Sequence, residues 1–402
     1  MFFRLHPRAR LGYRKPVEGN GNSDLVRDIR REIDASGGRI TFERFMDLAL
    51  YHPQFGYYTS GREKIGKRGD FFTSVSVGSL FGKLLAKQFL RFRKELGNPA
   101  EFEVVEFGGH RGQLRADVLA VAPDLRYRIV ETSDPRPESI VGCVFSNEFL
   151  DALPFHVVQV KNGAWQEAYV RTASPSPEPF PAHDSGVSRT RLPPKGEGPD
   201  KELLVPEIVV QAPRLPFSER RQAERLPYND FTEVLGPLSD PRLADFLSDL
   251  PVQHMEGYRT EVSLRALNWL SDVAKRLKRG WIVTIDYGYE RSEYFAPHHR
   301  DGTLLCYYQH TKSANPYANI GEQDITAHVE FTSFIEHGKK LGLEPVLFTD
   351  QSHYLLQIGE SEIAEIVERT AGQPSKERAA IQQLLHPEMM GRTFQVLVQR
   401  KV

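Results

Sequence analysis

The feature that most constrains this chain is an alternation of strand and helix patterns between residues 103 and 147. Three short apolar runs, 103–107 (EVVEF), 127–131 (YRIVE) and 141–145 (VGCVF), have the length and composition of buried strands. A glycine-rich turn at 108–112 (GGHRG) follows the first run and leads into a helical pattern. Parallel strands joined through helices need cover on both faces of the sheet. The sequence therefore predicts an α/β fold with a doubly wound sheet.

Further elements flank this block on both sides. Thr41 is the expected N-cap of a helix that reaches Leu50, and a second amphipathic helix spans 81–96. A later helical stripe ends at Gly280, which precedes a buried strand (WIVTID). The remaining expected strands are 345–348, 354–358 and 394–398. The expected organisation is a disordered arm (1–23), a helical N-terminal cover (24–100), a first core part (101–170), a proline-rich insertion or cover (171–255) and a second core part (256–402).

Composition and charge exclude several classes of protein. The chain has 52 Lys and Arg against 53 Asp and Glu, so its net charge of −1 gives no overall field that would hold nucleic acid or an anionic membrane. Two cysteines exclude a disulfide framework, and the histidines show no metal-binding spacing, so no metal is predicted. No run approaches the roughly 18 apolar residues of a membrane helix. We expect a soluble intracellular protein, with its oligomeric state left open.

The first 17 residues are rich in arginine, and no acid appears before Glu18. The basic residues are Arg4, Arg8, Arg10, Arg14 and Lys15. We expect the disordered arm of a protein of the bacterial cytoplasm; the alternative is a transit peptide that directs the chain to the mitochondrial matrix.

The turn at 108–112 has the features of a nucleotide site. Gly108 and Gly112 let a ligand approach the backbone, and the helix that follows offers free N–H groups. Glu131 ends the next strand, 25 positions after Glu106, where an acid can accept hydrogen bonds from the ribose of NAD or S-adenosylmethionine. The turn is not G-x-G-x-x-G, and Glu106 would repel a pyrophosphate but pair with an ammonium group. These features favour a methionine-bearing cofactor; an ordinary strand-to-helix turn is the open alternative.

Longer motifs carry a more specific resemblance. ITFERFMDLALYHPQFGYYTSG is followed by GDFFTS, VGSLFGKLLAKQF and SNEFLDALPFHVVQ. EVSLRALNWL, TIDYGY, GTLLCYYQH, GEQDITAHVEFTSF and HPEMMGRTFQVL come later in the same order. With these motifs the chain resembles the MidA-like family (DUF185) over about residues 30–400, apart from the proline-rich stretch. The resemblance implies a Rossmann-like class I S-adenosylmethionine-dependent methyltransferase; the family's best-known branch is the mitochondrial arginine methyltransferase that assists assembly of respiratory complex I.

Three departures from the family pattern concern the cofactor site. His110 stands where the middle glycine is expected, so its imidazole enters the space of the cofactor unless it turns outward. Ser76 stands where the family motif T-S-P-E carries a carboxylate. Only 15 residues separate Glu131 from Asn147. The fold normally places a helix, a third strand and another helix here, and one helical crossover alone needs about a dozen residues. The usual third strand and its helices, which bracket adenine, are therefore expected to be absent.

Residues near two strand ends are candidates for methyl transfer. Glu148 and Asp151 can form an acidic clamp that orients a guanidinium and accepts its proton; alternatively Asp151 caps a turn and Glu148 is solvated. Asn147 contacts cofactor or substrate, by resemblance. Asp286 follows another strand and is expected to act as a base or an orienting group, or else as a cap or salt-bridge partner.

His328 is a further candidate catalytic residue. It lies four positions after Asp324, so the two share one face if this segment is helical. An imidazole has a pKa suited to proton transfer, and the match to DITAHVEF supports that role. The alternative is a histidine that only packs in the core.

Glycines and aromatic residues between 51 and 74 have the composition of a cover over an active site. Methyl transfer benefits when such a cover excludes water. We expect Asp70 and Thr73 near the 108–112 turn, with Thr73 donating a hydrogen bond to the cofactor's carboxylate. The alternative is that both residues only cap the helix that begins near Ser76.

Two functions of different classes follow. The first is an S-adenosylmethionine-dependent methyltransferase that acts on arginine in a protein substrate. The second is a non-catalytic binding or assembly protein that kept the fold and lost the cofactor. A dehydrogenase ranks third, because G-x-G-x-x-G is absent. The expected cofactor contacts are Asp70, Thr73, Glu106, Gly108, Gly112, Glu131 and Asn147.

Overall fold

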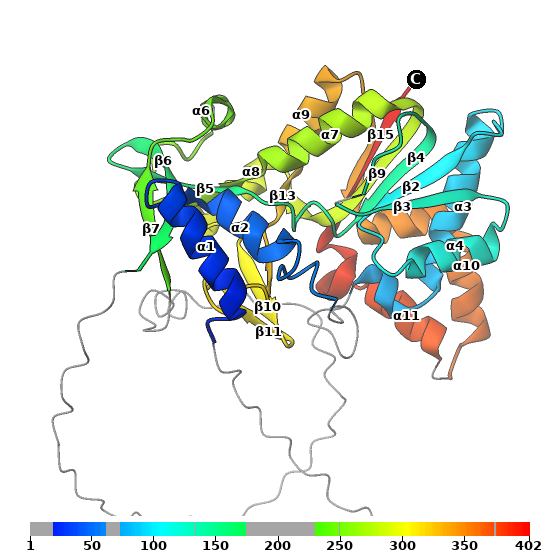
Figure 1. Ribbon diagram of the computed structural model, residues 1–402. Helices are drawn as coiled ribbons and strands as arrows, with labels where there is room; N and C mark the ends of the chain where they lie inside the picture. The colour runs from blue at the N-terminus through cyan, green and yellow to red at the C-terminus, as the bar shows by residue number, and fades with distance from the viewer. Residues whose placement is uncertain (1–18, 62–72, 133, 174–229, 249, 374) are drawn as a thin grey trace, which may run out of the picture.

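The computed structural model describes residues 19–61, 73–132, 134–173, 230–248, 250–373 and 375–402 (Figure 1). Its main sheet has seven strands, in the order β14-β15-β9-β4-β2-β3, with β13 also paired to β9. These strands are β2 (Glu103–Phe107), β3 (Arg126–Val130), β4 (Ile140–Asn147), β9 (Leu277–Tyr289), β13 (Val329–Glu330), β14 (Glu344–Asp350) and β15 (Phe394–Lys401). β3, β2, β4, β9 and β13 are parallel, and β15 runs antiparallel to both of its neighbours. The predicted α/β sheet is confirmed.

The strand register brings the carboxyl ends of the parallel strands to one edge. Phe107 at the end of β2 pairs with Val130 of β3 and with Ser146 of β4. Asn147 pairs in turn with Ile285 of β9. The residues that follow each strand therefore lie together on the side where parallel sheets bind ligands.

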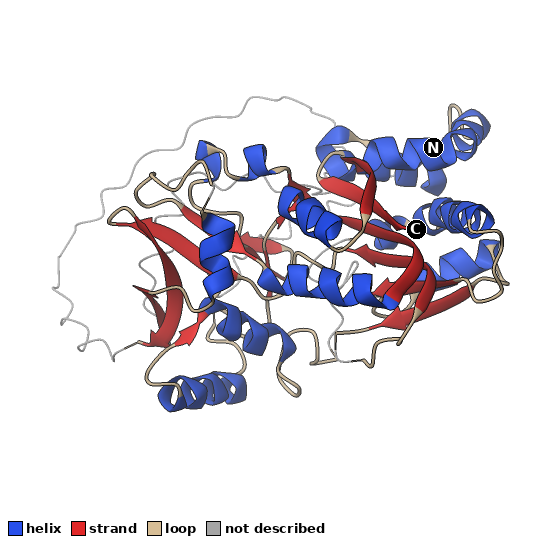
Figure 2. Ribbon diagram, turned by 90° about the horizontal axis from the view of Figure 1, so that it is seen from above, coloured by secondary structure: helices blue, strands red, loops and turns tan. Residues whose placement is uncertain are grey.

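Helices cover both faces of the main sheet (Figures 1 and 2). One face carries α3 (Leu80–Glu95), α4 (Gln113–Val121), α10 (Gln351–Arg369) and α11 (Lys376–Leu385), and the other carries α7 (Leu264–Arg276) and α9 (Phe331–Lys340). Each face of the sheet has its own hydrophobic core. Successive side chains of β2 point to opposite faces, so they enter different cores. Val104 packs with α3 and α10, whereas Val105 packs with α7 and α9.

A second, antiparallel sheet lies beside the first (Figure 1). Its order is β1-β6-β5-β8, with β7 paired to β6. The strands are β1 (Ile40–Thr41), β5 (His156–Lys161), β6 (Ala164–Thr172), β7 (Phe231–Gly236) and β8 (Arg259–Val262). α1 (Ser23–Ala35) and α2 (Phe42–Tyr51) share a core with this sheet, and α6 (Pro241–Leu247) packs with β5 and β8. The expected first core part, 101–170, thus includes β5 and most of β6, which belong to this second sheet.

Smaller elements connect the two sheets. A three-stranded sheet contains β10 (Leu305–Tyr308), β11 (Thr311–Ser313) and β12 (Asp324–Thr326). The short helical segments are η1 (Ser74–Val77), α8 (Arg291–Tyr294), η3 (Pro297–His299) and η4 (Pro387–Gly391). No helix in the described ranges is long and apolar enough to span a membrane.

The connection between β3 and β4 is short, as predicted from the 15 residues between Glu131 and Asn147. Residues 131–139, of which all but 133 are described, contain no helix and no strand. β3 therefore lies at the edge of the main sheet, and its Arg126 and Arg128 are exposed. The expected absence of the third strand of the fold holds for these described residues.

Three local predictions are wrong. Residues 354–358 belong to helix α10 and not to a strand, because Asp350 caps a helix that runs through them to a kink at Gly359, and a short apolar run does not distinguish helix from strand. Residues 324–328 are not helical: β12 ends at Thr326 and β13 begins at Val329, so Asp324 and His328 share no helix face.

Gly280 is the third correction, since it lies inside β9 and does not end α7. It pairs with Gly142 of β4, and a Cβ at Gly280 would lie 1.9 Å from the Gly142 carbonyl oxygen. The glycine is needed for the close approach of two central strands.

The start of the chain is also more ordered than expected where it is described. Asn22 caps α1 by accepting hydrogen bonds from the N–H groups of Asp24 and Leu25, and Gly21 forms a bridge to Ile320. The rest of the expected arm, residues 1–18, lies outside the described residues, as does most of the proline-rich stretch.

Candidate active site

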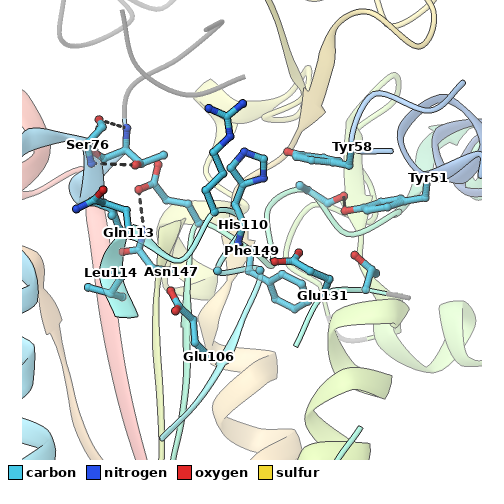
Figure 3. A pocket seen from close by; sticks show the side chains of 18 of the residues that line it. Tyr51, Tyr58, Ser76, Glu106, His110, Gln113, Leu114, Glu131, Asn147 and Phe149 are labelled. Carbon is cyan, nitrogen blue, oxygen red and sulfur yellow. Dashed lines mark hydrogen bonds between the residues drawn. The ribbon is translucent and has the colours of Figure 1, made fainter. Parts of the chain in front are cut away.

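A cavity of about 430 Å³ opens at the carboxyl ends of β2, β3 and β4 (Figure 3). The ends of these strands supply its floor, and the segment around η1 and two tyrosines from the N-terminal region supply the rest. Its polar lining includes Tyr51, Tyr58, Thr73, Ser76, Glu106, His110, Arg111, Gln113, Glu131, Thr132, Asn147 and Glu148. Five predicted cofactor residues, Thr73, Glu106, Gly108, Glu131 and Asn147, thus share one cavity with the predicted catalytic Glu148.

The glycine-rich turn wraps closely around two carboxylates. A Cβ at Gly109 would lie 2.7 Å from Oε2 of Glu106, so a larger residue at this position would push the Glu106 side chain aside. The backbone N–H of His110 donates to Oε1 of Glu131 at 2.7 Å. Gly112 is the N-terminal cap of α4, with no capping side chain. The turn is therefore held against Glu131 and covers Glu106, and both acids line the cavity.

His110 keeps the backbone shape of the glycine that it replaces. Its φ is 48°, in the left-handed region that costs a non-glycine residue about 1–2 kcal/mol. The imidazole is exposed and lies along the cavity (Figure 3). The imidazole of His110 therefore takes up space at the cavity that a glycine would leave open.

Glu106 is an almost fully buried acid on the cavity floor. Its Oε2 accepts a hydrogen bond from the hydroxyl of Tyr127 at 3.0 Å. Burial raises the pKa of Glu106 to about 7, and the nearby charge of Glu131 adds to this shift, while the Tyr127 bond opposes it. A positively charged ligand group beside Glu106 would restore its ionised form.

The end of β4 supplies a second polar group of residues. Glu148 has a φ of 53°, and its Oε1 accepts from the N–H of Ser74 at 3.0 Å and from Nδ2 of Asn147 at 2.9 Å. Burial raises the pKa of Glu148 to about 8. Oδ1 of Asn147 is buried and has no hydrogen-bond partner among the residues that the structure describes. An orphaned acceptor that lines a cavity fits a ligand that carries N–H donors.

Thr73 lies near the 108–112 turn, as expected, and it also caps a short helix. It lines the same cavity as the 108–112 turn. Its hydroxyl also accepts from the N–H of Ser76 and so caps η1, as the alternative predicted. Its hydrogen bond to a cofactor stays a prediction, and Asp70 lies outside the described residues.

Asp286 holds the backbone and does not line the cavity. Its carboxylate is fully buried, and Oδ2 accepts from the N–H groups of Leu150 at 2.8 Å and Phe149 at 3.1 Å. Burial raises its pKa to about 7, although these backbone hydrogen bonds oppose the shift. The geometry matches the capping alternative and gives no access to a substrate.

Asp151 and His328 do not line the large cavity. Both line a separate cavity of about 40 Å³. Burial raises the pKa of Asp151 well above its ordinary value, and the charges of Asp286 and Asp324 add to the shift. The predicted clamp is therefore divided, because only Glu148 faces the large cavity.

Two tyrosines complete the cavity, and sequence reasoning gave neither a specific role. The rings of Tyr51 and Tyr58 stack with centroids 5.4 Å apart. The Tyr51 hydroxyl donates to the carbonyl of Ala152, and the Tyr58 hydroxyl donates to Asp324 at 2.9 Å. The aromatic run YHPQFGYY was the available signal, but it does not show which rings turn inward. Tyr127 was missed because its role depends on the neighbouring strand.

A family model described as "Putative S-adenosyl-L-methionine-dependent methyltransferase" matches residues 84–138 and 130–349, more than half of the chain. The chain belongs to this family. The match includes the strands and turn that form the cavity floor. The predicted class of enzyme and its cofactor, S-adenosylmethionine, are thereby confirmed, as is the resemblance found in the sequence.

Curated relatives and solved structures agree with this family. The protein arginine methyltransferase NDUFAF7 of rat mitochondria is 24% identical over 407 residues, which cover 94% of this chain and 85% of that protein. The human NDUFAF7 is 25% identical over 94% of this chain and 84% of that protein. The Drosophila melanogaster homologue is 28% identical over only 39% of this chain and 46% of its own length.

The fold also matches a solved structure across nearly its whole length. A COG1565 superfamily member and likely methyl transferase from Burkholderia thailandensis, bound to S-adenosyl-homocysteine, has a TM-score of 0.75 and 27% identity. The match covers 94% of this chain and 92% of that protein. A native structure of a COG1565 protein from the same organism gives a TM-score of 0.72 at 25% identity.

Proposed function

We propose that this methyltransferase modifies a guanidinium nitrogen of arginine in a protein substrate. The observation that carries the proposal is the carboxylate of Glu148, which borders the cofactor cavity and is held by the N–H of Ser74. A guanidinium needs such an acid for orientation and for removal of its proton. The names of the NDUFAF7 relatives, which are protein arginine methyltransferases, support the same substrate class.

The cavity residues fit the proposed cofactor. Glu131 lines the cavity and would accept hydrogen bonds from the ribose hydroxyls, as an acid after the second strand does in related sheets. Glu106 and the unpartnered Oδ1 of Asn147 would face the ammonium of the methionine part. When bound, S-adenosylmethionine supplies the methyl group from its sulfonium.

Glu148 would act on the nucleophilic nitrogen. Its raised pKa keeps it protonated near neutral pH in the free protein, and a guanidinium cation beside it would lower that pKa. The ionised carboxylate then orients the guanidinium for in-line displacement. Glu148 would then take the proton that the guanidinium nitrogen releases when it receives the methyl group from the sulfonium, whose sulfur would keep the electron pair of the broken S–C bond.

The second candidate, a non-catalytic assembly protein, is favoured by two observations. The described part of the β3–β4 connection contains no strand or helix beside the adenine side of the cavity. The exposed imidazole of His110 also narrows the cavity. Both features reduce the contacts available to a cofactor.

Calorimetric titration with S-adenosylhomocysteine tests the two candidates together. We expect binding by the wild-type protein, and His110→Gly should bind at least tenfold more tightly, about 1.4 kcal/mol, because it widens the cavity and removes the strain. His110→Ala is the matched control, since it removes the imidazole but keeps the strained backbone. No binding by the wild type or by His110→Gly at millimolar ligand would favour the non-catalytic protein.

The substrate is tested with arginine-containing peptides and a labelled methyl donor. Glu148→Gln should retain S-adenosylhomocysteine binding and lose methyl transfer by about 10²-fold or more, because a neutral amide neither orients nor deprotonates a guanidinium. Equal transfer to peptides in which lysine replaces arginine would contradict the arginine assignment.

The same relatives also bear on the compartment in which this protein works. The NDUFAF7 proteins are mitochondrial, which supports the alternative of a mitochondrial matrix protein over a bacterial cytoplasmic one. Import of the labelled chain into isolated mitochondria, compared with a variant that lacks residues 1–18, tests this location.

A further inference from the structure

A chain of hydrogen bonds joins the turn after β4 to the helices α10 and α11 near the end of the sequence. Ser74, which begins η1, and Gln351, which begins α10, are both fully buried. The Ser74 hydroxyl donates to Oε1 of Gln351 at 3.0 Å, and Nε2 of Gln351 donates to the carbonyl oxygen of Leu384 in α11 at 3.2 Å. The N–H of Ser74 donates to Oε1 of Glu148. We propose that Gln351 is a positioning residue that holds the Glu148 carboxylate in place through Ser74.

This inference rests on the proposed function, in which Glu148 orients and deprotonates the substrate guanidinium. Gln351 does not line the large cavity, so it would affect methyl transfer only through the residues that it holds. Ser74 and Gln351 are 277 positions apart in the sequence. Sequence analysis missed this pair, because no spacing pattern connects two polar residues that only the folded chain brings together.

The orientation of the Gln351 amide follows from its two partners. A backbone carbonyl only accepts hydrogen bonds, so the amide nitrogen of Gln351 faces Leu384 and its oxygen faces Ser74. Sδ of Met390 also lies 4.0 Å from the Ser74 hydroxyl, but a thioether is a weak acceptor. The hydroxyl of Ser74 therefore donates to Gln351, and the backbone N–H of Ser74 donates to Glu148.

The bond from Ser74 also determines which oxygen of Glu148 meets a substrate. Among the described residues, two groups donate to the Glu148 carboxylate: the N–H of Ser74 and Nδ2 of Asn147. Both donate to Oε1, and Glu148 lines the cavity. Oε2 is therefore the oxygen that remains for a guanidinium. If η1 moved and the Ser74 bond were lost, only Asn147 would hold the carboxylate in this orientation.

The same bond lowers the pKa of Glu148. Burial raises this pKa to about 8, while the hydrogen bonds from Ser74 and Asn147 oppose the shift. The charge of Asp286 adds to it. Other titratable groups that interact with Glu148 or share its cavity are Asp151, Tyr287, Tyr307, Glu106, Glu131, His110 and Arg111. A substitution at Gln351 leaves all of these groups in place, so a further rise in the pKa of Glu148 would report the loss of the Ser74 bond.

Gln351→Met tests the inference, because methionine keeps the length of the side chain but removes the strong acceptor for Ser74. We expect the pKa of Glu148 to rise by at least about 0.5. Infrared difference spectra between each protein and the same protein carrying Glu148→Gln measure this pKa. The pH at which kcat for methyl transfer to an arginine peptide is half-maximal should rise as well. Ser74→Ala should change both values in the same direction, and it guards against misfolding of Gln351→Met because it removes only a hydroxyl.

Thr370→Val is the matched control on the same helix. Thr370 is the buried C-cap of α10, its hydroxyl donates to the carbonyl of Ile366 at 2.6 Å, and it does not line the cavity. This variant should lose stability and keep the pKa of Glu148. An unchanged pKa in both Gln351→Met and Ser74→Ala, or an equal rise in Thr370→Val, would overturn the inference.

The infrared measurement also separates this inference from the proposed function. If Gln351 only joined α10 to α11, Gln351→Met would lower stability and leave the pKa of Glu148 unchanged. Absence of arginine methylation by the wild type would contradict the proposed function. The infrared measurement needs no substrate, so the link from Gln351 to Glu148 is tested in either case.

Discussion

Glu106 illustrates how a single residue can serve ligand binding at a cost to the free protein. Its carboxylate is buried beneath Gly109 and receives one hydrogen bond, from Tyr127. Its pKa is about 7, compared with about 4.3 for a glutamate in an unfolded chain. The folded protein therefore binds this proton more tightly than the unfolded chain does, and folding stability falls as pH rises between these two values.

Glu106→Gln should remove this pH dependence. The unfolding free energy of the variant minus that of the wild type should increase by roughly 2–3 kcal/mol from pH 5 to pH 8, because only the wild type must ionise a buried acid at this position. Denaturant unfolding at both pH values measures this difference. Glu95→Gln, at an exposed position, should show no such growth, and a constant difference for Glu106→Gln would contradict the assignment.

At the scale of elements, the turn after β4 depends on a side chain from β9. Asp286 accepts from the backbone N–H groups of Phe149 and Leu150, while Glu148 itself has a positive φ. The turn can present Glu148 to the cavity because these buried N–H groups are satisfied by a carboxylate. Asp286 is thus a positioning residue.

Asp286→Asn keeps an oxygen that can accept these backbone hydrogen bonds, whereas Asp286→Ala leaves the buried N–H groups without an acceptor, so Asp286→Ala should lower the unfolding free energy by about 2 kcal/mol more than Asp286→Asn. Denaturant titration gives these values. The pH profile of methyl transfer should also shift in Asp286→Asn, since the charge of Asp286 raises the pKa of Glu148. An unchanged profile together with unchanged stability would refute the positioning role.

The sequence predicted the strand ends but not the direction of each side chain. The predicted positions of Glu106, Glu131 and Glu148 follow from a rule for parallel sheets: ligands bind at the edge where the carboxyl ends of the strands lie. The same rule placed Asp286 beside them, although its carboxylate turns into the backbone. Sequence spacing does not contain this choice, because the positive φ of Glu148 and the donors of the facing turn decide it.

At the scale of the whole molecule, chain length predicted topology better than local pattern did. The 15 residues before Asn147 were enough to predict the missing third strand. The second sheet was not predicted, because β6 pairs with β1 and β7, which are far from it in sequence. The apolar run at 354–358 was wrongly predicted to be a strand, because a short apolar run fits a buried helix as well as a strand.

The position of β15 has a consequence for the order in which this protein folds during synthesis. Residues 394–401 lie between β9 and β14, so a strand made late in translation occupies an interior place in the sheet. The cofactor residues at 106–148 are made long before the sheet around them can close, and such long-range pairing is slow. A chain that ends at residue 393 keeps every residue of the cavity lining, yet it should neither bind S-adenosylhomocysteine nor unfold cooperatively, as calorimetry would show; retained binding would contradict this order. Until residues 394–401 have been made, the edges of β9 and β14 that pair with β15 lack their partner strand.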